Sequence, residues 1–158
     1  MIKKIEPQTL KHVAGGFATG ITIVTIEDDK AEMYGMTANS FLSVSLDPPL
    51  VLFSVQNDAS FLKHCASKKK VGISILSQNQ KAISDQFAGL NKEDIEVSFV
   101  SKNKCHTLKN CLAWYETIIV QIIPAGDHQL MLCEVLDLGR DEKAKPLLYY
   151  SGYNKLSL

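Results

Sequence analysis

The stretch YGMTANSFLSVSLDPP, residues 34–49, decides the fold class that the sequence predicts. Apolar residues recur at every second position along most of it, which is the period of a β-strand with one face toward a core. The two prolines at its end stop the strand, because proline cannot donate a hydrogen bond to a sheet ladder. Thr37 and Asn39 share the other face, with Ser40 beside them. These short, uncharged hydrogen-bonding groups indicate either a solvated face or a binding site.

Segments with strand and helix patterns flank this stretch on both sides. Strands are predicted over residues 21–26, 50–55, 71–76, 97–100, 114–123 and 129–138. Helices are predicted over residues 7–18, from Asp58 or Ser60 onward, and over 78–89 after a capping box of Ser77 and Gln80. Short connections make most of the strands antiparallel. The sequence therefore predicts a small barrel or sandwich with helical decorations.

Three of these strands carry apolar residues on both faces. Residues 50–55 read LVLFSV and are predicted to be buried on both sides. Residues 114–123 and 129–138 need a second cover besides the core, and contact with another subunit is a candidate for it. Residues 91–111 are polar, and a long surface loop is predicted there around the short strand at 97–100.

Composition narrows the classes of function. A length of 158 residues predicts one domain over residues 1–158. Seventeen basic and seventeen acidic residues cancel and Arg140 is the only arginine, so no nucleic-acid partner is expected. With neither a signal region nor an apolar run of membrane-spanning length, we expect a cytoplasmic protein that does not enter a membrane. The four cysteines match no common zinc pattern, and no metal site is expected.

No nucleophile with a neighbouring base can be read from the sequence. The most suggestive titratable residue is His128, which follows Gly126-Asp127 between two predicted strands. It is either a turn histidine bonded to the backbone or a donor that points into a cleft. The helix start after residues 50–55 presents N–H groups suited to a phosphate, although most helix starts bind only water.

The order of motifs along residues 8–153 carries a resemblance to a known family. GFATGITIVT, GMTANSFLSVSLDPPLVLFSV, VGISIL, DQFAG, GDHQLMLCEV and PLLYYSGY follow one another in this order. This sequence resembles the flavin reductases, which are short NAD(P)H:flavin oxidoreductases with an FMN-binding split β-barrel. They are often partners of two-component monooxygenases. The resemblance implies a mainly β homodimer, an antiparallel Greek-key split barrel with helical decorations, and a flavin at or near the subunit interface.

The resemblance also implies a set of site residues. Met36, Thr37, Ala38, Asn39 and Ser40 would line the isoalloxazine and ribityl chain, with Thr19 as a further neighbour. Ser54, Val55, Gln56 and Ser60 would surround the ribityl–phosphate arm, and Phe87 and Ala88 would close one side. His128 would lie near the flavin and nicotinamide, and Tyr153 near the entrance. Ser74 stands where family members often carry asparagine, and it reaches less far than an asparagine would. Residues 91–111 match the family poorly.

The implied reaction is hydride transfer from NADH or NADPH to N5 of FMN or FAD, with His128 as the catalytic residue. Stacked rings and exclusion of water suffice for this transfer, so no covalent nucleophile is needed. The reduced flavin would then serve a separate oxygenase. Two alternatives stay open: an electron carrier with permanently bound flavin, and a non-catalytic dimeric flavin-binding module. Arg140 offers no clear clamp for a 2′-phosphate, which favours NADH over NADPH.

Overall fold

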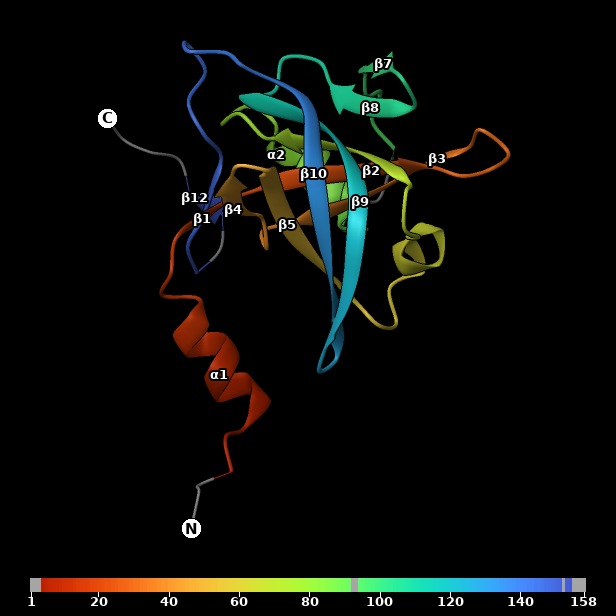
Figure 1. Ribbon diagram of the computed structural model, residues 1–158. Helices are drawn as coiled ribbons and strands as arrows, with labels where there is room; N and C mark the ends of the chain where they lie inside the picture. Colours follow the sequence, from red (N-terminus) through yellow and green to blue (C-terminus); the bar gives the residue numbers. More distant parts are fainter. Residues whose placement is uncertain (1–3, 92–93, 152, 155–158) are drawn as a thin grey trace.

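The computed structural model describes residues 4–91, 94–151 and 153–154 (Figure 1). The helices are α1 (Pro7–Ala14), the 3₁₀ helix η1 (Ser60–His64) and α2 (Lys81–Phe87). The strands are β1 (Thr19–Gly20), β2 (Thr22–Glu27), β3 (Met33–Ala38), β4 (Leu42–Leu46), β5 (Pro49–Gln56), β6 (Lys70–Ile75), β7 (Phe99–Lys102), β8 (Cys105–Leu108), β9 (Ala113–Ala125), β10 (His128–Arg140), β11 (Leu148–Tyr149) and β12 (Tyr153–Asn154).

Seven strands form one antiparallel sheet in the order β3-β2-β6-β9-β10-β5-β4. The long β9–β10 hairpin inserts between β6 and β5, so those two consecutive strands are not neighbours. The two end strands, β3 and β4, are separated in the chain only by residues 39–41. Three extended residues span only about 10–14 Å, so the ends of the sheet must come close and the sheet curls into a barrel. The predicted antiparallel split β-barrel with helical decorations is confirmed.

Residues 34–46 form two strands, β3 and β4, and not a single one. The backbone leaves the β3 ladder after Ala38 and pairs again, with β5, from Leu42 onward. The apolar period continues in phase across this break, and so the pattern alone did not reveal it. The prolines do end β4 at Leu46, as expected.

The core lies inside the barrel, with a second, smaller cluster beside it. Alternate residues of β5, namely Val51, Phe53 and Val55, point into the main core. The intervening side chains of this strand are partly or fully exposed, so the prediction that residues 50–55 are buried on both faces was wrong. The smaller cluster packs Ile23 and Leu76 against residues of α2, β8 and β11. It fastens the helix and the C-terminal segment to the barrel.

Local departures from the predictions concern element ends and one hairpin. Helix α1 ends at Ala14, before the two glycines, and α2 begins only at Lys81. One of the two hydrogen bonds of the predicted capping box is present: the Ser77 N–H donates to Gln80 Oε1 at 2.9 Å. Within the stretch predicted as a loop with one short strand, β7 and β8 instead pair as an antiparallel hairpin.

Apolar surface remains uncovered at several places, and two of them are α1 and β4. Helix α1 extends away from the barrel and buries none of its residues (Figure 1). Leu10 and Val13 on this helix are exposed, and Phe17 just after it is 78% exposed. Edge strand β4 likewise exposes Leu42 and Leu46, the latter to 95%. Neither place is covered by another part of the described chain.

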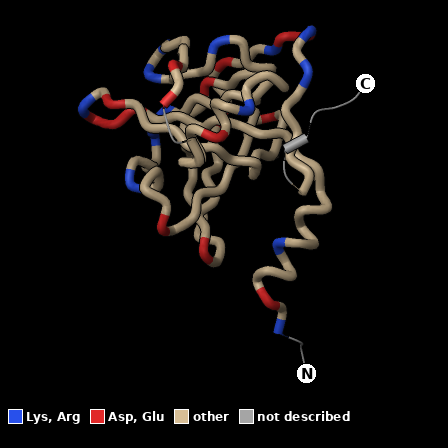
Figure 2. Tube along the Cα trace, turned by 180° about the vertical axis from the view of Figure 1, so that it is seen from behind, with Lys and Arg blue, Asp and Glu red and all other residues tan. Residues whose placement is uncertain are grey.

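Charged residues of both signs are interspersed around the loops (Figure 2). This distribution agrees with the zero formal net charge of the sequence. Within the residues that the structure places, no helix combines the length and the apolar character needed to cross a membrane.

Candidate functional site

A pocket of about 580 Å³ opens where α1, β1, the end of β3 and the C-terminal segment meet. The residues that line it come from these four parts of the chain: Lys11, His12, Ala14, Gly15, Phe17, Thr19, Ile21, Thr37, Ala38, Asn39, Tyr149 and Ser151. Four of them, Thr19, Thr37, Ala38 and Asn39, belong to the set implied by the family resemblance. The structure therefore brings together one group of the predicted residues at a concave surface.

Backbone pairing and side-chain hydrogen bonds hold this group in place. Thr19 of β1 pairs with Tyr149 of β11, which places the C-terminal segment beside the pocket. The Thr37 hydroxyl donates to the carbonyl of Ser84 at 2.6 Å and ties β3 to α2. The carbonyl of Ala38 accepts a hydrogen bond from the Thr22 hydroxyl at 2.8 Å. The pocket wall is therefore built on strands that the core already fixes.

One polar atom in the lining lacks a partner. The Thr19 hydroxyl oxygen is buried and has no hydrogen bond in the described structure. Leaving a buried hydroxyl unpaired costs roughly 1–3 kcal/mol. A ligand with hydrogen-bonding atoms would satisfy it. Among the described residues no carboxylate lines the pocket, whereas Lys11 and His12 do. The residues present therefore suit a polar, anionic ligand such as a flavin nucleotide.

A second group of predicted residues forms a line that leads away from the pocket. Ser40 follows Asn39, and its hydroxyl accepts the Ser54 N–H at 2.9 Å. Gln56 lies two residues further along the same outward face of β5, about 7 Å from Ser54. It stands opposite His128 in the β5–β10 register. Ser40, Ser54 and Gln56 thus lead in succession from the end of β3 to the β9–β10 turn.

His128 itself lies at this turn and is not part of the pocket lining. Its Nδ1 lies 2.7 Å from Asp127 Oδ1, and about a third of its side chain is exposed. The hydrogen bond from His128 lowers the pKa of the Asp127 carboxyl below its ordinary value, and the charge of His128 adds to this effect. The imidazole is therefore hydrogen-bonded to a carboxylate. The sequence had indicated either a histidine bonded to the backbone or a donor that points into a cleft, and neither possibility included Asp127.

Several other predicted site residues have structural roles. The Ser74 side chain is fully buried, and its hydroxyl accepts the Leu108 N–H at 2.9 Å, so it joins β8 to β6. Val55 is also in the core. Neither residue lines the pocket, and their assignment to the site stays a prediction. Met36 packs against the main core and Phe87 against the smaller one.

The remaining predicted residues do not line the pocket. Ala88 is the C-cap of α2, and Ser60 is the exposed first residue of η1. Tyr153 pairs through its backbone with Tyr149, which does line the pocket. The side chain of Tyr153 lies outside what the structure describes.

Sequence reasoning missed the contributions of α1 and of the C-terminal segment. Lys11 and His12 lie in the last turn of a helix whose only visible signal was its amphipathic spacing. Tyr149 belongs to the tyrosine-containing tail, where only Tyr153 was assigned a role. Ser151 had no distinguishing signal at all. Pairing of β1 with β11 brings together segments 130 residues apart, and one sequence does not reveal such a pairing.

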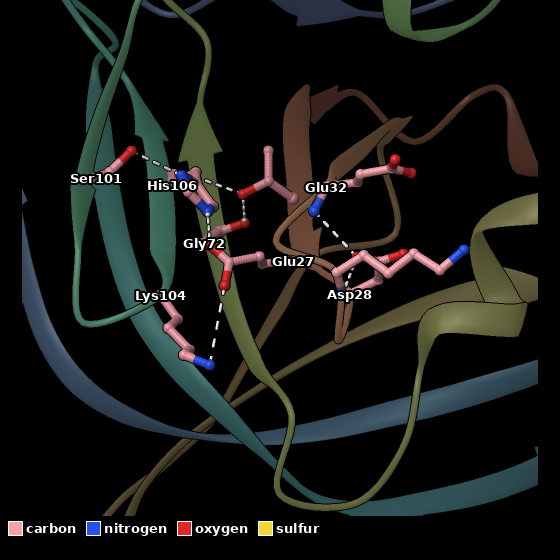
Figure 3. Close-up of polar contacts among 9 residues, drawn as sticks. Glu27, Asp28, Glu32, Gly72, Ser101, Lys104 and His106 are labelled. Carbon is pink, nitrogen blue, oxygen red and sulfur yellow. Dashed lines mark hydrogen bonds and ion pairs between the residues drawn. The ribbon is translucent and has the colours of Figure 1, made fainter.

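A second polar cluster lies outside the pocket (Figure 3). His106 Nε2 lies 3.0 Å from Glu27 Oε2, and its Nδ1 lies 2.7 Å from the Ser101 hydroxyl. The carbonyl of His106 accepts a hydrogen bond from Thr25 and lies so close to Gly72 that a side chain there would collide with it. These contacts fasten the β7–β8 hairpin onto β2 and β6. No group of side chains suited to hold a metal ion occurs among the described residues.

Comparison with known proteins identifies the family. The sequence pattern described as flavin reductase like domain matches residues 14–157. The chain belongs to the flavin reductase family. An NADH-dependent flavin reductase from Rhodococcus sp is 39% identical over 151 residues, which cover 94% of this chain and 85% of that protein. The reductase component of 4-hydroxyphenylacetate 3-monooxygenase from Thermus thermophilus is 32% identical over 150 residues, 94% of this chain and 96% of that protein.

Solved structures of flavin reductases share the fold. Flavin reductase PheA2 in its native state superimposes with a TM-score of 0.92 at 38% identity, covering 98% of this chain and all of that one. The NADH:FAD oxidoreductase of Streptomyces globisporus C-1027, in complex with NAD and FAD fragments, gives a TM-score of 0.87 at 31% identity. That comparison covers 98% of this chain and 97% of the other.

Proposed function

We propose that this protein is a flavin reductase that oxidises NADH, reduces FMN or FAD, and supplies the reduced flavin to a separate monooxygenase. The observation that carries the proposal is the carboxylate-free pocket with the unpaired Thr19 hydroxyl in its wall. Membership of the flavin reductase family supports the same reaction. The named activities of the Rhodococcus and Thermus relatives support NADH as the donor and an oxygenase as the recipient.

The pocket residues would bind and orient the substrates. A bound flavin supplies N5 as the acceptor of a hydride from the reduced nicotinamide. The Asn39 amide and the Thr19 hydroxyl would hold the polar edge of the ring with uncharged hydrogen bonds. Ile21 and Ala38 offer apolar surface that excludes water. Ser54 and Gln56 would contact the flavin along the outward face of β5.

His128 is proposed to act on the nicotinamide. Its hydrogen bond to Asp127 restrains the ring at the end of the line formed by Ser40, Ser54 and Gln56. From this position it would donate to or accept from the carboxamide and fix the orientation of the nicotinamide. The role is one of positioning, because hydride transfer requires no proton from this side chain.

A homodimer is proposed on the basis of the uncovered apolar surface. Exposed apolar residues are found on α1, on β4 and on the outer face of β10, where Leu136 and Leu138 lie. Surfaces of this kind commonly mark contacts between subunits. We also propose a cytoplasmic location, which the four free cysteines support because free thiols persist in reducing compartments.

Turnover with free flavin tests the proposed function. Purified protein is mixed with NADH and an excess of FMN, FAD or riboflavin, and the absorbance of the reduced nicotinamide is followed. Many turnovers per protein chain are expected. One turnover of a flavin that remains bound would instead identify an electron carrier. Flavin binding without NADH oxidation would identify a non-catalytic binding module.

A further inference from the structure

The basic side chains of the pocket all come from one helix. Lys11 and His12 line it, and no aspartate or glutamate does so among the described residues. The opposite wall, at Thr37 and Asn39, is polar but uncharged. The pocket therefore has one cationic side and one neutral side. An isoalloxazine or nicotinamide ring suits the neutral side, and the phosphate of a nucleotide suits the cationic side.

Two structural explanations for the presence of these basic residues are weak. Basic residues near a helix C-terminus offset the partial negative charge of its free carbonyls. Here the carbonyls of Lys11 and Val13 already accept the N–H groups of Gly15 and Gly16. Ion pairing does not explain the cations either, because no salt bridge within the described part of the chain includes Lys11 or His12.

Helix α1 also has no core contact to fix its position. None of its residues is buried, yet its last turn borders the pocket. A ligand phosphate between Lys11 and His12 would supply charge-assisted hydrogen bonds that connect the helix to the barrel. Such bonds are about twice as strong as neutral ones.

We propose that Lys11 and His12 form a phosphate clamp, through which α1 recognises the phosphate group of a nucleotide substrate in the pocket. This inference rests on the proposed function, and it adds α1 to the residues that select substrates. The phosphate can belong to the flavin nucleotide or to NADH. In either case the clamp makes the enzyme favour phosphorylated substrates over the corresponding ribosides.

Paired substrates with and without phosphate test the clamp. Lys11→Ala, His12→Ala and the double variant are compared with the unaltered protein, and Lys4→Ala serves as a control for a lysine outside the pocket. In one arm FMN is compared with riboflavin at fixed NADH. In the other, reduced nicotinamide mononucleotide, the phosphorylated half of NADH, is compared with reduced nicotinamide riboside at fixed riboflavin. The phosphate-free substrates also report whether each variant has folded.

The clamp predicts a KM for the phosphorylated substrate that rises about tenfold or more in the double variant. The KM for the phosphate-free analogue should stay within about twofold of its value in the unaltered protein. Lys11→Arg should keep most of the affinity for the phosphorylated substrate that Lys11→Ala loses. A selective effect in the first arm assigns the phosphate to the flavin, and one in the second assigns it to NADH. The clamp would be overturned if the double variant changed the KM of the phosphorylated and of the phosphate-free substrate equally, or changed neither.

The clamp and the proposed function can fail separately. If the unaltered protein turns over no flavin, the reductase proposal is refuted. The clamp is then judged from the dissociation constants of FMN and riboflavin, measured by quenching of flavin fluorescence. The clamp would be refuted if the ratio of the FMN and riboflavin dissociation constants were the same in the double variant as in the unaltered protein.

Discussion

Ser40 and Ser54 are joined by two hydrogen bonds beside the opening of the barrel between β3 and β4. The Ser54 N–H donates to the Ser40 hydroxyl at 2.9 Å, and that hydroxyl donates back to the Ser54 carbonyl at 3.3 Å. The two residues belong to the β3–β4 connection and to β5. This reciprocal contact lies next to Asn39 in the pocket and thus joins barrel closure to the candidate site.

Replacing Ser40 with alanine should weaken both the barrel and the site. Loss of the hydroxyl leaves the partly buried Ser54 N–H without its acceptor, which should cost about 1–2 kcal/mol of unfolding free energy. Flavin affinity should fall with it. Urea denaturation and fluorescence quenching measure the two effects. Ser43→Ala on the exposed part of β4 is the matched control, and equal behaviour of the two variants would contradict this role.

Thr19→Val should shift stability and flavin affinity in opposite directions. Valine keeps the shape of threonine but removes the buried hydroxyl that has no partner. The ligand-free protein should become more stable, by up to about 1 kcal/mol, while the dissociation constant of FMN increases. Thermal unfolding without and with FMN measures both. A decrease in ligand-free stability would show that the hydroxyl already has a partner.

His128→Ala should impair the use of NADH more than the binding of flavin. The imidazole lies at the β9–β10 turn, outside the pocket lining, so the ring-binding residues remain in place. The KM for NADH should rise several-fold or kcat should fall, whereas the FMN dissociation constant should change little. His64→Ala, on η1, is a suitable histidine control. Unchanged kinetics with NADH would exclude the positioning role.

The Asp127 carboxyl should titrate below its usual pKa of 3.8, because His128 donates a hydrogen bond to the charged form. A folded-state pKa below the unfolded value means that the pair contributes stability above pH 3.8. That contribution is lost as the pH falls through the folded-state pKa. Carbon NMR of the carboxyl group measures the midpoint. In His128→Ala the midpoint of the Asp127 titration should return toward 3.8. If the midpoint is the same in the variant and in the unaltered protein, the two side chains are not coupled.

Leu46→Glu should reduce self-association if β4 lies at the proposed dimer interface. Leu46 is almost fully exposed in one chain, so a glutamate there leaves the fold of the monomer intact. In an apolar interface the same carboxylate would be desolvated without a partner. Light scattering after size-exclusion chromatography gives the mass of each protein. A variant that keeps the mass of the unaltered protein would place the interface elsewhere or show that no dimer exists.

Much of the sheet could be predicted from local periodicity. The alternation in residues 34–38 and the apolar runs of β2, β5 and β6 all led to strands in nearly the right places. The break after Ala38 could not be seen, because the apolar residues on either side of it keep the same phase. Strand β8 was missed because only half of its residues are apolar and its burial depends on contacts with β2 and β6.

The site was predictable only where its residues are neighbours in sequence. Thr37, Ala38 and Asn39 share one short stretch and were found together at the pocket. Tyr149 reaches the same pocket through the β1–β11 pairing, which no local pattern indicates. Ser74 was included because its position matched the family motif, and only its burial reveals that it belongs to the core.

The two ends of the seven-stranded sheet are tethered by residues 39–41, while no backbone ladder joins β3 to β4 in the part of the chain that the structure describes. The aperture of the barrel is therefore limited by the length of this tether rather than by a backbone ladder between β3 and β4. Each added residue would allow the edges to separate by up to about 3.4 Å. Insertions here would tune the width of the cleft without disturbing a single strand pairing.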